Sequence, residues 1–125
     1  LVMVLSDVGH GDLLGRVALI PENNKFVLNQ RVALLRPFNN IIPQFLFYNI
    51  NVNQKYFKMQ GAGMSQLNIS KSSVESFISY IPSDLKEQQK IGNYFQKLDS
   101  QIDLQQKELE KLKNIKKASL AKIFV

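Results

Sequence analysis

The sequence IGNYFQKLDSQIDLQQKELEKL, residues 91–112, decides the architecture because its apolar side chains recur alternately four and three residues apart. This narrow spacing is typical of a coiled-coil seam, whereas a helix packed on a globular domain shows a wider apolar stripe. Gln105 interrupts the seam, and a buried polar residue there commonly fixes register or partner choice. The residues predicted to pair with a second helix are Ile91, Phe95, Leu98, Ile102, Leu109 and Leu112.

The helix that carries this seam is predicted to cover residues 86–125. Asp84 is placed to cap its N-terminus, and Glu87, three residues later, can bond back to the cap. A helix of this length extends about 60 Å at 1.5 Å per residue. The alternative is an ordinary amphipathic helix folded back on the preceding residues, but the length and the narrow seam favour pairing with another helix.

Three apolar runs near the N-terminus predict strands, at residues 1–5, 16–20 and 26–36. The second and third runs flank a turn at Pro21–Asn24, so they are expected to pair as an antiparallel hairpin. A further strand is expected at residues 77–81, where the following proline ends it. These runs predict a sheet in the first part of the chain.

A helical segment is predicted after the first strands, opened by Pro43, because proline is favoured in the first turn of a helix. Its buried face is expected to contain Phe45, Leu46, Ile50 and Phe57. Ser70 is predicted to cap one short helical turn farther along. The expected fold class is therefore α+β, with a mixed α/β domain over residues 1–85 followed by a long coiled-coil helix over residues 86–125.

The chain is basic, with a formal net charge of +6. Seven Lys and Arg residues oppose five acidic residues before residue 86, and nine lysines oppose five acidic residues after it. This excess favours an anionic partner, with nucleic acid first and an acidic protein surface second. All three arginines precede the long helix, and arginine suits forked contacts to phosphates and guanine edges, whereas lysine on a helix is more often solvated. The lysines of the helix therefore carry little information about DNA.

The polar loop QGAGMSQLN, residues 60–68, is the candidate binding loop. It lacks the GK[ST] ending of a P-loop, so nucleotide binding is not expected. Its amides and polar side chains can contact a nucleic-acid backbone or base edge, or its glycines can simply form a turn. The lysines that bracket the loop favour contact with phosphate. The candidate DNA-contacting residues are Arg16, Arg31, Lys55, Lys58, Gln60, Ser65, Gln66, Asn68 and Lys71.

No catalytic residue, metal site or cofactor is expected. The chain has no cysteine, which excludes disulfides and cysteine-type zinc sites and fits a reducing compartment. His10 lies between Asp7 and Asp12 but is the only histidine, so we interpret it as a solvated loop residue. The apolar runs are too short to span a membrane, and the chain is expected to be soluble.

Short motifs follow one another along the chain in a recognisable order. Upstream, GRVALI stands at residues 15–20 and NQRVALLRP at residues 29–37. The later motifs are GAGMSQLNIS at 61–70, YIP at 80–82, EQQKIG at 87–92, FQKLDSQI at 95–102, KELEKLK at 107–113, Lys116-Lys117 and Ile123-Phe124. No single motif is specific, but the ordered set, which covers nearly the whole chain, resembles the C-terminal half of a specificity subunit of type I restriction-modification systems.

The resemblance implies different tasks for the two parts of the chain. Residues 1–85 would be part of a target-recognition domain that reads one half of a split target in double-stranded DNA. The helix would pair antiparallel with a second copy or another half-subunit. It would also hold the methyltransferase subunits and, through them, the restriction subunit. Members usually contain two recognition domains, so a fragment, a truncated half-subunit or a split gene product is expected, cytoplasmic and without catalytic activity of its own.

The main alternative is an assembly protein that does not bind DNA. Its basic helix would bind an acidic partner, and the mixed domain would be only a platform. The two hypotheses differ in salt dependence, because phosphate contacts predict a DNA affinity that falls steeply between about 50 and 200 mM salt. An enzyme acting alone ranks third, since the sequence offers no nucleophile–base pair and no metal-binding cluster.

Overall fold

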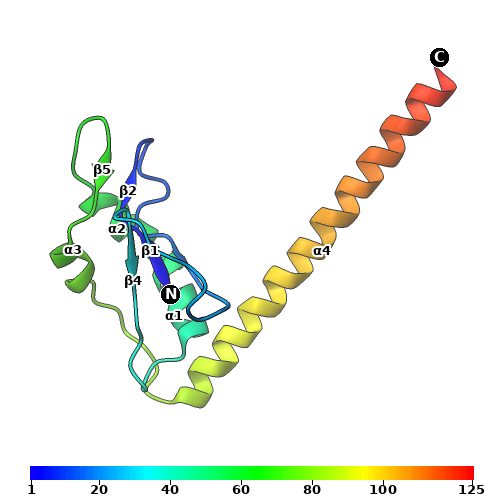
Figure 1. Cartoon of the computed structure of the whole chain (residues 1–125). Coiled ribbons are helices and arrows are strands. Elements are labelled where there is room, and N and C mark those ends of the chain that lie inside the picture. The colour runs from blue at the N-terminus through cyan, green and yellow to red at the C-terminus, as the bar shows by residue number, and fades with distance from the viewer. The chain divides into compact units, whose positions relative to one another are not determined.

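The strand β1 (Val2–Val4) is the centre of a three-stranded antiparallel sheet in the computed structural model, which describes residues 1–125 (Figure 1). β3 (Val17–Ala18) pairs with one edge of β1 and β4 (Val32–Leu34) with the other. Met3 stands opposite Val17 and Ala33 in these ladders. The side chain of Met3 is buried, so the central strand contributes directly to the core.

The predicted hairpin between residues 16–20 and 26–36 is wrong, because β1 lies between β3 and β4. Only Val17–Ala18 and Val32–Leu34 form strands in these two runs, and a long loop joins them. Both edges of β1 carry backbone donors and acceptors that need partners, and pairing with β3 and β4 satisfies them. The local pattern contained no sign that a strand from the N-terminus would be inserted.

The chain continues from β1 through Leu5 into β2 (Ser6–Asp7), which pairs antiparallel with β5 (Leu67–Asn68). Leu5 connects the two sheets, since its N–H donates to the carbonyl of Arg31 and its carbonyl accepts from the N–H of Ile69, both at 2.8 Å. The N–H and C=O of one strand residue point to the same side. β4 and β5 therefore follow one another along one edge of the β1–β2 strand.

Two consecutive helices, α1 (Pro43–Val52) and α2 (Gln54–Gln60), supply the apolar face that the sequence predicted. Pro43 occupies the first turn of α1, where its missing N–H breaks no helical hydrogen bond. The prediction is confirmed by Phe45, Ile50 and Phe57, which are buried, and by Leu46, which packs against the core.

Phe57 is fully buried in the core of the first part of the chain. Its ring centroid lies 4.9 Å from that of Phe77, in the segment after α3 (Lys71–Glu75). Gly15 packs against Phe57 with a φ of +71°, and a Cβ at residue 15 would lie 2.2 Å from the Phe57 Cβ. Only glycine satisfies both the space and the backbone conformation. The core residues are Met3, Leu14, Val17, Ile50, Phe57 and Ile69.

The segment before the long helix is not the predicted strand at residues 77–81, since it pairs with no strand. Side chains bond two of its polar groups instead. Asn49 Nδ2 donates to the Ser79 hydroxyl at 3.0 Å, and the carbonyl of Pro82 accepts from Gln88 Nε2 at 2.8 Å. The Ser70 cap of α3 is confirmed, because its hydroxyl accepts from the Ser73 N–H at 3.1 Å.

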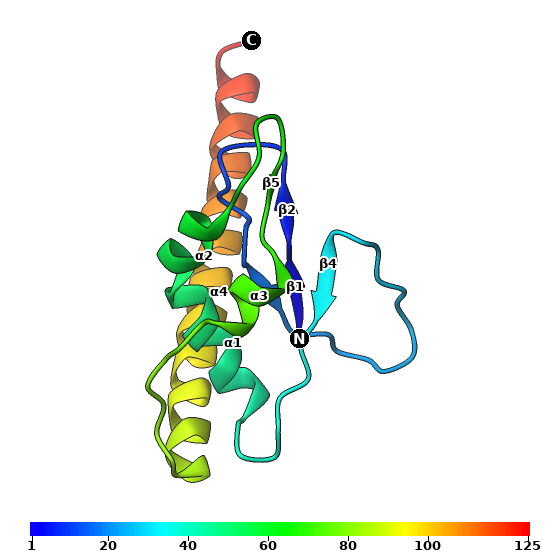
Figure 2. The same cartoon turned by 90° about the vertical axis from the view of Figure 1, so that its left-hand side faces the viewer.

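α4 (Leu85–Ile123) is one continuous helix of 39 residues, about 58 Å long at 1.5 Å per residue (Figure 2). The predicted cap is confirmed, because Asp84 Oδ1 accepts from the Lys86 N–H at 2.8 Å. The chain divides into a first unit, Leu1–Gly92, and a second unit, Asn93–Val125, so the first two turns of α4 belong to the first unit. The predicted α+β fold class with a long C-terminal helix is confirmed. None of the helices is both long and apolar enough to cross a membrane.

Candidate nucleic-acid interface

Two loops of the first unit lie side by side at one end of the β2–β5 pair (Figures 1 and 2). One joins β2 to β3 and contains Gly11, and the other joins α2 to β5. A Cβ on Gly61, in the second loop, would lie 2.6 Å from Cδ1 of Leu14 in the first loop, so the two loops touch there. Lys58 Nζ also lies 2.6 Å from Oδ1 of Asp12, which is 46 positions away in the chain. We call these two loops the loop pair.

Asp7 holds the first loop in shape. Its Oδ1 accepts from the Gly9 N–H at 3.1 Å, and its Oδ2 accepts from the Leu13 N–H at 3.2 Å. These backbone hydrogen bonds, that from Gly9 first, hold the pKa of Asp7 below its usual range because they stabilise the charged carboxylate. The first loop is therefore ordered by an ionised carboxylate at neutral pH.

Asp12 contacts two of the predicted DNA-contacting residues. Its carboxylate accepts from Lys58, and its main-chain carbonyl accepts from Arg16 Nε at 3.4 Å. The hydrogen bond from Lys58, and then the charge of Lys58, lower the pKa of Asp12. Because an ammonium group has three N–H donors, Lys58 keeps donors for a phosphate while it is bonded to Asp12. The ion pair is largely solvent-exposed and contributes little to stability.

The second loop, between α2 and β5, is closed by a pair of backbone hydrogen bonds between Ala62 and Asn68, at 3.0 and 2.9 Å. Gly63 has a φ of +139°, which favours glycine, so the loop does form a turn. The same turn leaves Ser65 and Asn68 exposed and Gln66 half-buried. Gln66 Nε2 donates to Asn68 Oδ1 at 3.2 Å, which orients both amides. The turn and an accessible polar edge therefore coexist.

The other predicted residues are less closely gathered. Lys55 is exposed and lies one helical turn before Lys58 on α2, and Gln60 ends that helix half-buried. Lys71 begins α3 and forms an ion pair with Glu75 at 3.6 Å. Arg31 is exposed in the turn immediately before β4. Neither Arg31 nor Lys71 makes a hydrogen bond or ion pair with the loop pair. The structure thus brings together Arg16, Lys58 and the polar loop, with Lys55 one turn away.

Asp12 was not singled out by the sequence analysis, although it organises the charges of the loop pair. A carboxylate among cations weakens the field that attracts phosphates, so it matters for any anion bound there. The sequence carried no signal for this contact, because residues 46 positions apart share no local pattern. No group of three or more His, Asp or Glu side chains is arranged to hold a metal ion.

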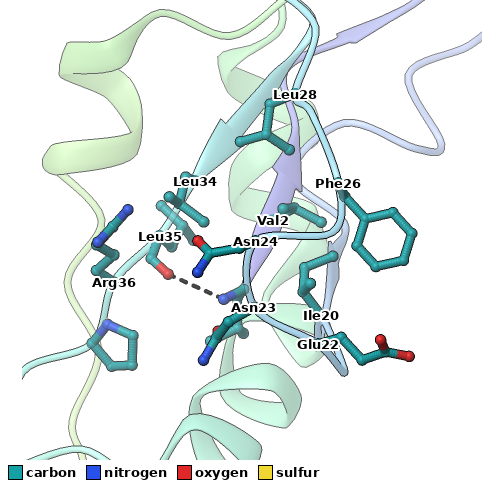
Figure 3. A pocket seen from close by; sticks show the side chains of 12 residues that line it. Val2, Ile20, Glu22, Asn23, Asn24, Phe26, Leu28, Leu34, Leu35 and Arg36 are labelled. Atoms are coloured by element: carbon teal, nitrogen blue, oxygen red, sulfur yellow. Dashed lines mark hydrogen bonds between the residues drawn. The ribbon is translucent and has the colours of Figure 1, made fainter.

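A separate cavity of about 580 Å³ lies beside β1 and β4, under the loop that follows β3 (Figure 3). Ile20, Phe26 and Leu34 line it with apolar surface. Leu1 also lines it, and its N-terminal ammonium donates to the Leu35 carbonyl at 3.1 Å. The cavity contains none of the predicted DNA-contacting residues. It is therefore distinct from the loop pair.

The seam of α4 presents apolar side chains at the predicted spacing. Ile91 is half-buried, and the seam residues beyond it are exposed at Phe95, Leu98, Ile102, Leu109 and Leu112. On another face of the helix, Lys107 Nζ forms an ion pair with Asp103 at 2.9 Å. Pairing of this seam with a second helix stays a prediction.

A protein-family model for the type I restriction modification DNA specificity domain matches residues 7–114. The matched stretch contains the loop pair and most of α4. No solved structure matches the chain.

Proposed function

The chain belongs to the type I restriction modification DNA specificity domain family, and we propose that its first unit reads one half of a split target in double-stranded DNA. The observation that carries this proposal is the loop pair, where Asp12 bonds both Arg16 and Lys58 and the neighbouring loop presents an accessible polar turn. The proposed reader is therefore the end of the β2–β5 pair rather than the long helix.

β2 and β5 form a two-stranded antiparallel pair, a form that a DNA groove can admit. A two-stranded antiparallel ribbon has strands about 4.8 Å apart, and the major groove of B-DNA, about 12 Å wide, admits such a ribbon. Asn68 and Gln66 carry side-chain amides, which can bond the edge of an adenine. Lys55, Lys58 and Arg16 would contact phosphates and fix the register, since phosphate contacts position a protein while base contacts specify the sequence.

α4 is proposed to pair antiparallel with a second copy of the chain or with another half-subunit. Its length of about 58 Å exceeds the roughly 34 Å of one DNA turn, so recognition units carried by such a pair can address half-sites more than one turn apart. The helix pair would also bind the methyltransferase subunits and, through them, the restriction subunit. Methyl transfer and cleavage would be carried out by those partners.

Equilibrium binding of the whole chain to duplex DNA tests the proposal. Three phosphate contacts predict that affinity falls about 40-fold between 50 and 200 mM salt, from a slope of about −0.9 per contact. An assembly protein that acts only through its basic helix would bind DNA at neither salt concentration. Absence of binding at 50 mM salt, with and without methyltransferase subunits, would favour that second function.

A further inference from the structure

Gln88, in the first turn of α4, is the only buried polar side chain of the chain, with none of its surface exposed. Its Oε1 accepts from the N–H of Ile42, the N-cap residue of α1, at 2.9 Å. Its Nε2 donates to the carbonyl of Asn40 at 3.2 Å and to that of Pro82 at 2.8 Å. One side chain therefore joins α4 to the turn before α1 and to the segment before α4 itself.

Gly92 makes a second contact one helical turn after Gln88. Its Cα approaches α1 so closely that a Cβ would lie 3.2 Å from Gln44 Cγ and 3.3 Å from the Phe45 backbone nitrogen. Residues four positions apart lie on the same face of a helix. One face at the start of α4 is therefore held at two points against the N-terminal turn of α1, within the first unit.

The chemistry of this contact favours a positioning role over simple core filling. A buried amide costs free energy unless its donors and acceptors are paired, and an apolar side chain would fill the same volume without that requirement. Hydrogen bonds are directional, so three of them restrict both the rotation and the tilt of the helix. Glycine is also a poor helix former, and at residue 92 it permits the close approach.

We infer that Gln88 and Gly92 are positioning residues that fix the direction in which α4 leaves the first unit, and that they thereby determine which half-site spacing is accepted. The second part of this inference rests on the proposed function. The helix acts as a long lever, because Gly92 and Ile123 are about 47 Å apart at 1.5 Å per residue. A tilt of roughly 10° at Gly92 moves the far end by about 8 Å, which is more than two base pairs at 3.4 Å each.

The first part is tested by a distance measurement that needs no DNA. The chain has no cysteine, so spin labels can be attached at Ser76→Cys in the first unit and Asn114→Cys in the second. Pulsed electron spin resonance on labelled chain diluted with unlabelled chain reports the distance within one molecule. The variants are Gln88→Met, which keeps the length of the side chain but removes its hydrogen bonds, and Gly92→Leu, which keeps Gln88 but blocks the close approach.

In the parent chain we expect a narrow distribution of distances between the two labels. In both variants this distribution should shift or broaden by about 6 Å, because a 10° tilt at Gly92 moves residue 114, 22 helical residues away, by that distance. The matched control is Gln96→Met, the same substitution at an exposed glutamine of α4, which should leave the distribution unchanged. Circular dichroism confirms that each variant is folded. An unchanged distribution in both folded variants would overturn the inference, whatever the chain does with DNA.

The second part is tested on duplexes that carry the two half-sites at different spacings. Gln88→Met should keep the same half-site sequence preference but accept spacings one or two base pairs from the optimum. The affinity for duplexes with these spacings, relative to the affinity for the duplex with the optimal spacing, should be several-fold higher in the variant than in the parent chain. An equal loss at every spacing would overturn this part and leave Gln88 a stabilising residue only. Failure of the parent chain to select any sequence would count against the proposed function, and the spin-label result would still decide the positioning role.

Discussion

The Lys58–Asp12 pair gives a quantitative prediction about DNA binding. Lys58→Gln removes one phosphate contact, which contributes about 0.9 to the slope of log affinity against log salt. Counted from 1 M salt, where the contact contributes nothing, this slope gives an expected loss of affinity of about eightfold at 0.1 M salt and about threefold at 0.3 M salt. Because Asp12 Oδ1 lies 2.6 Å from Lys58 Nζ, Asp12→Asn removes a competing anion and should raise affinity instead.

Fluorescence anisotropy with a labelled duplex between 50 and 300 mM salt measures both effects. In the double variant Lys58→Gln with Asp12→Asn, the gain in DNA affinity that Asp12→Asn gives should be smaller than in the parent chain. Part of that gain acts through the Lys58 ammonium, which the double variant lacks. Lys25→Gln is the matched control, since Lys25 is similarly exposed and forms an ion pair with Glu22 at 2.9 Å in a different loop. Equal losses for Lys25→Gln and Lys58→Gln would refute a local contact and leave only an effect of net charge.

Three further predictions concern the fold, the first loop and the seam. Gly15→Ala should lower the free energy of unfolding by about 2–4 kcal/mol in chemical denaturation, because its Cβ would overlap Phe57 at a positive φ. Because the pKa of Asp7 is lowered in the folded chain, its carboxylate stabilises the first loop at any pH above the ordinary carboxyl pKa of about 3.9. This stabilisation is lost as the pH falls through the lowered pKa. Lower protection factors for the amides of that loop at low pH, measured by NMR hydrogen exchange, check this. Leu98→Asp with Ile102→Asp should abolish self-association or partner binding in analytical ultracentrifugation, because two charges would enter an apolar seam.

Each of these predictions has a control variant or an outcome that would refute it. Leu104→Asp places a charge on an exposed leucine outside the predicted seam, and equal association of the seam variant and this control would contradict helix pairing. In Asp7→Asn the protection factors of the loop amides, which are corrected for the intrinsic pH dependence of exchange, should no longer change with pH in the acidic range. If Gly15→Ala unfolds at the denaturant concentration of the parent chain, the packing of Phe57 described above is wrong.

Local signals in the sequence predicted the helices and their caps well. Pro43, Ser70 and Asp84 each mark a helix start because their effect depends on the nearest backbone groups alone. Strand order could not be predicted in the same way. The residues around Val17 and Val32 form strands, but their common partner is Met3, and no local pattern reports which strand lies between them.

The candidate site was predictable in residue type but not in arrangement. Polarity and glycine content drew attention to residues 60–68, and the structure adds that this loop meets the one around Asp12. The role of Gln88, by contrast, could not be predicted even from its residue type. A glutamine on a polar helix gives no sign of burial, and only the positions of the Ile42 amide and the Pro82 carbonyl reveal why it is buried.

Selection of DNA from a randomised duplex pool tests directly whether the chain reads half of a split DNA target. The purified chain would be incubated with the pool, alone and together with the methyltransferase subunits of its own system, and the retained DNA sequenced. We expect enrichment of a split motif, with at least one half-site lost in a variant that combines Lys58→Gln and Asn68→Ala. Failure to enrich any motif, even with the methyltransferase subunits present, would contradict the proposed function.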